Sequence, residues 1–403
     1  MLHFCNMKKR LLFFEVMKYV EHKNALVITG MRQVGKTTLL RQVFEHIGPK
    51  PKLWFDFDNP LDQKIFEDIE YRNIYARLCD MSSLPKHGRL YVFIDEIQNF
   101  PEITKVIKYL IDHYSVKFFV TGSSNFYLKN IFPESLSGRK FLYDLPPFSF
   151  GEYLYFHDKL GLDTALAAEP ALFQSVQTIT QFKEREVEYA QYLRHGGFPE
   201  VVLSSGEELK TQVLKNIFTS FFEKDLRLLS DYTDVRELRD LILLLVPRVG
   251  SMIDVTKLAS ELGVSRPKIY AYLEFLQGVF FIRLLPKFSK SIDRSIAAGK
   301  KVYFTDTGLL RALGNVNDAQ LFENAVINQL SRYGAVSFYN KRNTAEIDAV
   351  LNKKIAFEVK IKGDEQDFQK LDRLARELEI ESGRVISRDF VDSPHIISGS
   401  MII

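Results

Sequence analysis

One short segment, Gly30 to Thr38, constrains the fold of this chain more than any other. Its two glycines, Gly30 and Gly35, are separated by four residues and followed by Lys36 and Thr37, and the apolar run 25–29 precedes it. This is the spacing of a phosphate-binding loop, which joins a buried strand to a helix whose positive end faces the bound anion. The candidate nucleotide-binding residues are Gly30, Gln33, Val34, Gly35, Lys36, Thr37 and Thr38.

Two acids at the end of a second apolar run are candidates for the residues that hydrolyse a nucleotide bound to this loop. Residues 89–96 carry apolar side chains without alternation, as in a parallel strand buried on both faces, and end in Asp95 and Glu96. Ligands of open α/β sheets bind at the carboxyl ends of the strands. We therefore expect Asp95 and the hydroxyl of Thr37 to hold Mg²⁺, and Glu96 to orient or deprotonate the water that attacks ATP.

A third apolar run, residues 117–122, ends in Ser123, Ser124 and Asn125. A polar side chain at this strand end can reach the γ-phosphate and the attacking water, and Asn125 or Ser124 would suit that role. The alternative is that the same residues cap the next helix.

Composition limits the remaining possibilities. The 403 residues suffice for two to four domains, and 46% hydrophobic with 26% charged residues is typical of a soluble globular protein. Without an uncharged apolar run of about 18 residues, we expect no membrane span. The basic residues 8–10 begin an amphipathic helix rather than a signal peptide. Two cysteines without paired spacing argue against a zinc site or a disulfide framework, so we expect a cytoplasmic protein.

The middle of the chain is predicted to be helical from residue 150 to about 245, with helices over 152–157, 182–193 and 209–229. Between the last two lies the sequence His195-Gly196-Gly197-Phe198-Pro199. Paired glycines permit close backbone approach or positive φ, which favours a structural elbow. We expect His195 to serve packing or capping rather than catalysis.

Residues 255–276 have the pattern of a helix-turn-helix, with Gly263 in the turn and Ser265 as the cap of the second helix. The apolar runs 279–285 and 301–304 would form a wing. Residues 248–304 contain ten Lys or Arg and four Asp or Glu, a net charge of 10 − 4 = +6 against +3 for the whole chain. Ser265, Arg266 and Lys268 are therefore candidate DNA contacts. The alternative is a winged helix that binds protein or senses the nucleotide.

A third set of polar residues lies near the end of the sequence. Asp348 precedes Glu358 across a predicted β-hairpin, and Glu358 and Lys360 share one side of their strand because side chains alternate. Two carboxylates and a lysine could bind Mg²⁺ and assist water in cutting a phosphodiester. The set resembles the restriction-endonuclease-like nuclease core, with Glu323 as the acid on a helix. Active cleavage and a nuclease-like fold without activity both remain open.

Taken together, residues 30–38, 93–96, 121–125, 136–139 and 196–199 resemble the prokaryotic P-loop ATPases of the AAA superfamily that carry a C-terminal domain of unknown function. The resemblance implies an α/β core sheet in the order 5-1-4-3-2, with a helical lid, a winged-helix module and a C-terminal α/β nuclease-like domain appended. It also makes Arg139 a candidate arginine finger or γ-phosphate sensor. The expected domains are 1–148, 149–245, 246–314 and 315–403.

The leading hypothesis is an Mg²⁺-dependent ATPase that couples its nucleotide state to the winged helix and the C-terminal domain, acting on or near DNA. It would work as an oligomer or with a protein partner that supplies or receives an arginine. Two alternatives are an ATP-switched metal-dependent nuclease and a DNA- or protein-binding regulatory module that uses ATP as a ligand.

Overall fold

The computed structural model describes residues 8–82, 88–122, 138–166, 177–222, 232–289, 291, 299–341 and 345–403. The chain divides into two compact units. Unit 1 comprises residues 1–146 with 278–280, and unit 2 comprises residues 147–277 with 281–403. No helix in the described part of the chain is long and apolar enough to cross a bilayer.

Unit 1 is built on a parallel sheet of five strands, ordered β2-β3-β4-β1-β5. The order 5-1-4-3-2 implied by the family resemblance is therefore confirmed. The central strands β1, β3 and β4 are buried along their whole length, which explains their continuous apolar sequences. The strands are β1 (Ala25–Thr29), β2 (Lys52–Asp56), β3 (Tyr91–Asp95), β4 (Lys117–Gly122) and β5 (Lys140–Asp144).

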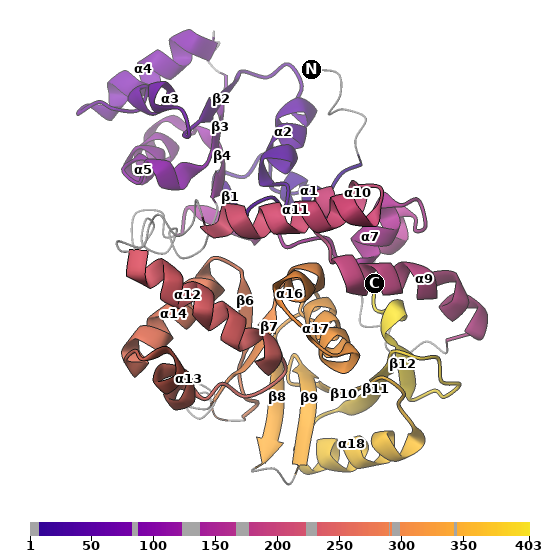
Figure 1. Cartoon of the computed structure of the whole chain (residues 1–403). Coiled ribbons are helices and arrows are strands. Elements are labelled where there is room, and N and C mark those ends of the chain that lie inside the picture. The colour runs from indigo at the N-terminus through magenta and orange to yellow at the C-terminus, as the bar shows by residue number, and fades with distance from the viewer. Residues whose placement is uncertain are drawn as a thin grey trace. The chain divides into compact units, whose positions relative to one another are not determined.

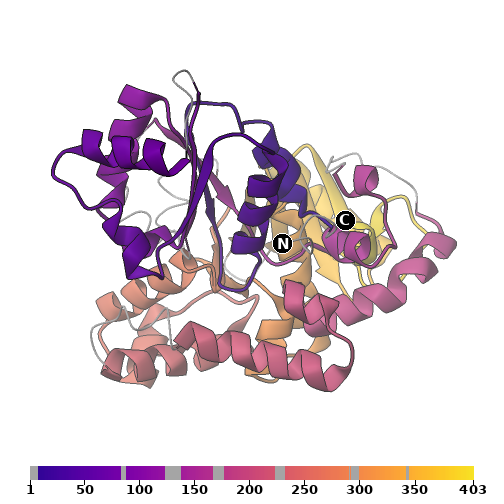
Figure 2. The same ribbon diagram turned by 90° about the horizontal axis from the view of Figure 1, so that it is seen from above.

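Helices cover both faces of this sheet (Figures 1 and 2). Helix α2 follows the glycine loop and packs against β3 and β4 on one face, whereas α3, α4 and α5 lie on the other. The apolar sides of α4 and α5 join the strands in one core that includes Ile74, Ile107 and Val120. The helices are α1 (Leu11–Met17), α2 (Lys36–His46), α3 (Pro60–Lys64), α4 (Tyr71–Ser82), the 3-10 helix η1 (Ile97–Asn99) and α5 (Ile103–Tyr114).

Unit 2 begins with helices, as predicted. A capping box between Ser149 and Glu152 starts α7, and a second one between Thr178 and Gln181 starts α9. The helix predicted over 209–229 begins at Glu207 and is described as far as Ser220, and residues 223–231 lie outside the described part. The helices are α7 (Phe150–Phe156), α8 (Leu162–Leu166), α9 (Ile179–His195), α10 (Pro199–Leu203) and α11 (Glu207–Ser220).

The predicted helix-turn-helix at residues 255–276 is present. Gly263 ends the first helix in the left-handed conformation, with φ 68°. Two antiparallel strands, β6 and β7, follow it. The elements here are α12 (Tyr232–Leu245), the 3-10 helix η5 (Val246–Arg248), α13 (Val255–Leu262), α14 (Arg266–Gly278), β6 (Ile282–Leu285), β7 (Lys301–Phe304) and α16 (Thr307–Leu313).

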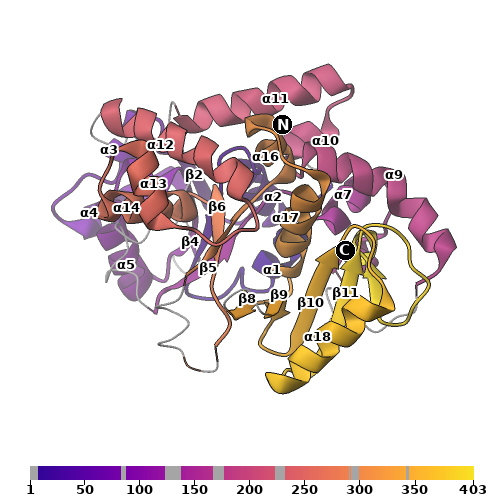
Figure 3. The ribbon, with the colours of Figure 1, turned by 60° about the horizontal axis from the view of Figure 1, so that its bottom comes forward.

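A second sheet, ordered β12-β11-β10-β9-β8, forms the last part of unit 2. Strands β8, β9 and β10 are antiparallel, and β10, β11 and β12 are parallel. Helix α18 packs on β10 and β11 (Figure 3). The elements are α17 (Asp318–Leu330), β8 (Val336–Lys341), β9 (Ala345–Leu351), β10 (Ile355–Lys360), α18 (Glu365–Glu377), β11 (Ser382–Ser387), β12 (Ile396–Ser398) and the 3-10 helix η6 (Gly399–Met401).

Candidate functional site

The glycine loop connects β1 to α2 in the conformation that its sequence predicts. Gly30 has φ 149° and Gly35 has φ 94°, and Gln33 between them also has a positive φ of 62°. A Cβ atom on Gly30 would lie 2.2 Å from the carbonyl oxygen of Leu145, so only glycine fits there. The buried ammonium of Lys36 donates to the carbonyls of Gly30, at 2.9 Å, and Met31, at 3.0 Å.

The buried carboxylate of Asp95 is the next element of the site. It lies at the end of β3 and accepts hydrogen bonds from the hydroxyls of Thr121 and Thr37. Burial raises the pKa of Asp95, and these two hydroxyls partly offset the rise. The structure therefore brings together Thr37 and Asp95, the two residues that the sequence predicts as Mg²⁺ ligands.

Glu96 turns the chain out of β3 in a left-handed conformation, with φ 54° and ψ 50°. Its backbone N–H donates to the hydroxyl of Thr121, at 3.1 Å, and its carboxylate accepts a hydrogen bond from the side-chain amide of Gln98. Glu96 is half-buried, and its charge acts on the neighbouring Asp95.

Sequence reasoning missed Thr121, whose hydroxyl contacts both acids at the end of β3. The available signal was a hydroxyl near the end of a buried apolar strand. The neighbouring candidate Asn125 falls within residues 123–137, outside the described part, as does Ser124.

Arg139 is not brought to this site. It immediately precedes β5, and its carbonyl accepts from the N–H of Ala25, the first residue of β1. The glycine loop follows the last residue of β1, so Arg139 lies at the opposite end of a five-residue strand, about 15 Å away. Its guanidinium pairs with Asp112 at 2.7 Å. This placement excludes contact between Arg139 and a γ-phosphate bound to the loop of the same chain.

The four residues of the predicted nuclease-like set lie close together in unit 2. Asp348 accepts from the N–H of Val359 at 2.8 Å, and Lys360 pairs with Glu358 at 2.7 Å. Burial, and then the charge of the nearby Asp348, raise the pKa of both Glu323 and Glu358.

A buried lysine from β7 lies within this acid cluster, which we define as Glu323, Glu346, Asp348 and Glu358. The ammonium of Lys301 is 2.7 Å from Glu346, 3.8 Å from Glu323 and 3.9 Å from Asp348. Burial would lower the pKa of Lys301, but the surrounding carboxylates raise it above its usual value. Among the described residues, no three acidic, His or Cys side chains are arranged to hold a metal ion.

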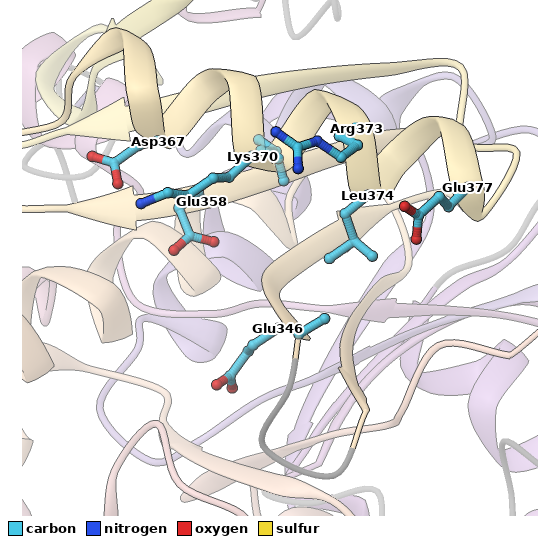
Figure 4. Close-up of a pocket in the computed structure, with 9 residues that line it drawn as sticks. Glu346, Glu358, Asp367, Lys370, Arg373, Leu374 and Glu377 are labelled. Carbon is cyan, nitrogen blue, oxygen red and sulfur yellow. The ribbon is translucent and has the colours of Figure 1, made fainter.

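A pocket of about 430 Å³ adjoins the cluster between α18 and strands β9 and β10. Figure 4 shows Asp367 and Lys370 of α18 next to Glu358, with Glu346 lower in the view. The wall of the pocket thus carries both acidic and basic side chains, and sequence reasoning did not predict this pocket.

The three predicted DNA-contact residues differ in their surroundings. Ser265 and Arg266 are exposed at the start of α14. Lys268 instead pairs with Asp234 at 2.8 Å and Glu237 at 2.6 Å, both on α12.

The paired glycines form an elbow, as predicted, after α9. The N–H of Gly197 donates to the buried carboxylate of Asp306 at 2.7 Å, and a Cβ atom on Gly196 would lie 2.1 Å from the same carboxylate. His195 packs at the end of α9 and contacts Glu207 at 3.1 Å, which agrees with a packing role. Asp306, whose carboxylate also accepts from the N–H of Leu309, was not predicted.

Comparison with protein-family models gives three matches. Residues 22–154 match an AAA domain, residues 186–320 match a domain of unknown function (DUF8612), and residues 319–394 match another (DUF4143). An uncharacterized protein of Methanocaldococcus jannaschii is 26% identical over 378 residues, which are 88% of this chain and 80% of that protein. An uncharacterized protein of Haemophilus influenzae is 26% identical over 353 residues, 83% of this chain and 82% of that protein.

Among solved structures, the chain is similar to the Walker-type ATPase of Pyrococcus abyssi, with 17% identity and a TM-score of 0.48 over 76% of this chain and 95% of that one. The likeness to the Aeropyrum pernix ORC1 protein in complex with DNA is weaker, with 12% identity and a TM-score of 0.33 over 75% and 90% of the two chains. The family matches agree with the glycine loop, the acids after β3 and the strand order. The first part of the chain therefore matches an AAA domain, and the two matches to domains of unknown function follow it.

Proposed function

We propose that this protein binds ATP with Mg²⁺ at the Gly30–Thr38 loop and hydrolyses it. The observation that carries the proposal is the contact between Thr37 and the buried Asp95, with Glu96 as the next residue. A hydroxyl and a carboxylate at one point are the oxygen ligands that Mg²⁺ prefers. When bound, the ion would neutralise charge on the β- and γ-phosphates.

The side chains of Lys36 and Glu96 suit phosphate binding and activation of the attacking water. The ammonium of Lys36 now donates to two carbonyls of its own loop, and we expect phosphate oxygens to replace them as its partners. Gln98 orients the carboxylate of Glu96, which keeps its other oxygen for the attacking water.

Two substitutions separate binding from hydrolysis. We expect Lys36→Ala to lose ATP binding, and Glu96→Gln to keep binding while turnover falls by about a hundredfold or more, because a general base contributes that much. The matched control is Glu102→Gln, the same change at an exposed acid of unit 1. ATP binding is measured by calorimetry and turnover by phosphate release. Unchanged turnover in both site variants would refute the proposal.

If Arg139 acts as an arginine finger, its place at the far end of the sheet requires that it reach the nucleotide of another copy. Loss of ATP turnover in Arg139→Ala, restored when that variant is mixed with Lys36→Ala, would support contact between copies. Full turnover by Arg139→Ala alone would refute it.

We further propose that the helix-turn-helix and strands β6 and β7 form a winged helix that contacts DNA through the start of α14. The supporting observations are the net charge of +6 over residues 248–304 and the exposure of Ser265, Arg266 and Tyr270, of which Tyr270 is 61% exposed. An exposed arginine at the start of a recognition helix suits a phosphate or a guanine edge.

The ion pairs of Lys268 predict different effects of Lys268→Ala and Arg266→Ala on DNA binding. Because two carboxylates already neutralise Lys268, Lys268→Ala should weaken DNA binding less than Arg266→Ala does. Affinity is measured against salt concentration, where a phosphate contact shows as a shallower slope in the variant. Equal losses for both variants, or no binding by the parent protein, would contradict this assignment.

The hypothesis of a metal-dependent nuclease fits the structure less well. Glu323, Asp348, Glu358 and Lys360 are assembled beside a pocket, but Lys301 supplies the cation of the cluster, and the described residues hold no ready metal site. We therefore expect no cleavage of DNA or RNA with ATP and Mg²⁺ or Mn²⁺. Cleavage that disappears in Asp348→Ala would restore the nuclease hypothesis.

A further inference from the structure

A buried arginine donates a hydrogen bond to the glycine loop. Arg10 immediately precedes α1 and is only 6% exposed. Its Nη1 donates to the carbonyl of Val34 at 2.8 Å, and its Nη2 donates to the carbonyl of Pro146 at 2.8 Å. Burying a guanidinium is costly unless such hydrogen bonds compensate for the lost water. The contact thus ties the loop to the segment that follows β5.

The acceptor of this hydrogen bond is part of the loop itself. The carbonyl of Val34 and the N–H of Gly35 belong to the same peptide group, and Gly35 is the cap of helix α2. In a loop of this kind, the N–H groups at the helix start face the phosphates. Donation from a cation to the carbonyl polarises the peptide group and makes its N–H a stronger donor.

The backbone on either side of Val34 needs this support. Gln33 and Gly35 both have positive φ angles, and for Gln33 that conformation is unfavourable. Such a conformation persists where the surroundings hold it in place. Arg10 holds the Val34–Gly35 peptide group by its hydrogen bond to the carbonyl of Val34. At the other end of the loop, the carbonyl of Leu145 packs against Gly30.

We infer that Arg10 is a positioning residue of the nucleotide site, which acts on the phosphates of ATP through the Val34–Gly35 peptide. The inference rests on the proposed function as an ATP-binding protein. It extends the site beyond the residues of the glycine loop and the strand ends, to the start of α1.

The test compares Arg10→Met and Arg10→Lys with the parent protein. We expect the Kd for ATP with Mg²⁺ to rise about tenfold in Arg10→Met, the loss expected for a charged hydrogen bond, and less in Arg10→Lys, which keeps the charge. The kcat at saturating ATP should change less than KM, because Arg10 does not act on the attacking water. Millimolar ethylguanidinium should restore affinity to Arg10→Ala but not to Lys36→Ala.

The matched control is Arg77→Met in the same unit. Arg77 also anchors a loop, donating to the carbonyl of Ile65 at 2.5 Å and pairing with Asp68 at 3.2 Å. It lies on α4, which packs on the edge strand β2, whereas the glycine loop follows β1. We expect its loss to lower Tm without changing the Kd. If Arg10→Met does not fold, Arg10→Lys carries the comparison.

The outcomes are distinguishable. If the parent protein does not bind ATP, the proposed function and this inference both fail. If it binds ATP and Arg10→Met binds equally well, only the inference fails. A loss of affinity that Arg77→Met shows to the same extent would also overturn it, because general destabilisation would then explain both.

Discussion

A single hydroxyl connects the two acids of the nucleotide site. Thr121 donates to Asp95 and accepts from the N–H of Glu96, so it fixes both residues at the end of β3. We expect Thr121→Val to keep ATP binding and to lower turnover by about tenfold, roughly the effect of one lost hydrogen bond in a buried site.

Thr104→Val is the control for Thr121→Val. Thr104 is also buried in unit 1, and its hydroxyl donates only to the carbonyl of Pro101, at 3.2 Å. The turnover of Thr104→Val should equal that of the parent protein. Equal turnover in Thr121→Val would show that the hydroxyl is dispensable.

Asp306 gives a residue-scale prediction about pH. Burial raises its pKa from 3.8 to about 6, although backbone N–H groups of Gly197, Leu309 and Gly308 favour the ionised form. Because the folded pKa lies above the unfolded one, ionisation costs more in the folded state. The free energy of unfolding should therefore fall by about 2 kcal/mol as pH rises from about 4 to about 6.

Urea unfolding of the parent protein and of Asp306→Asn at pH 4, 5 and 6.5 checks this prediction. The advantage of the parent protein over the variant should be largest at pH 4 and shrink toward pH 6.5. A difference that stays flat or grows with pH would show that Asp306 is not the titrating group.

Lys301 of strand β7 lies within the acid cluster, so the β6–β7 pair and the C-terminal sheet depend on each other. Removing the charge in Lys301→Met leaves the largely buried carboxylates of Glu323 and Asp348 without this cation, and we expect a loss of about 3 kcal/mol in the free energy of unfolding. Adding Glu346→Gln should recover part of it.

Lys354→Met is the comparison for Lys301→Met. Lys354 pairs with Glu381 at 3.3 Å, but both side chains are more than 60% exposed. Its loss should cost less than about 0.5 kcal/mol in denaturant unfolding. Equal costs for the two lysines would contradict the role of Lys301.

Prediction from sequence succeeded where one local pattern sets one element. The loop at 30–38, the acids 95 and 96 and the turn at Gly263 each depend on neighbouring residues, and the structure has them as expected. Arg139 shows the limit. Its sequence neighbours do not reveal which end of the parallel sheet it occupies. Lys301, Asp306 and Arg10 act through partners that are distant in sequence, so no local pattern identifies them.

The division into two compact units leads to a prediction for the whole molecule. The proposed ATP site lies in unit 1, and a ligand stabilises only the folded part that binds it. ATP with Mg²⁺ at about 100 times its Kd should add about 2.7 kcal/mol to the unfolding free energy of unit 1. Calorimetry or hydrogen exchange resolves the two units. Equal protection of unit 2 would mean that the units unfold together.

Lys301 and strand β7 also determine where a stable C-terminal fragment should begin. The side chain of Asn324 hydrogen-bonds both backbone groups of Phe304 in β7: its Oδ1 accepts from the N–H at 2.8 Å, and its Nδ2 donates to the carbonyl at 2.9 Å. A fragment that starts at residue 315 would keep the acid cluster and lose both Lys301 and strand β7. Anyone producing the C-terminal sheet alone should therefore begin upstream of Lys301, even though the family model of that region begins at residue 319.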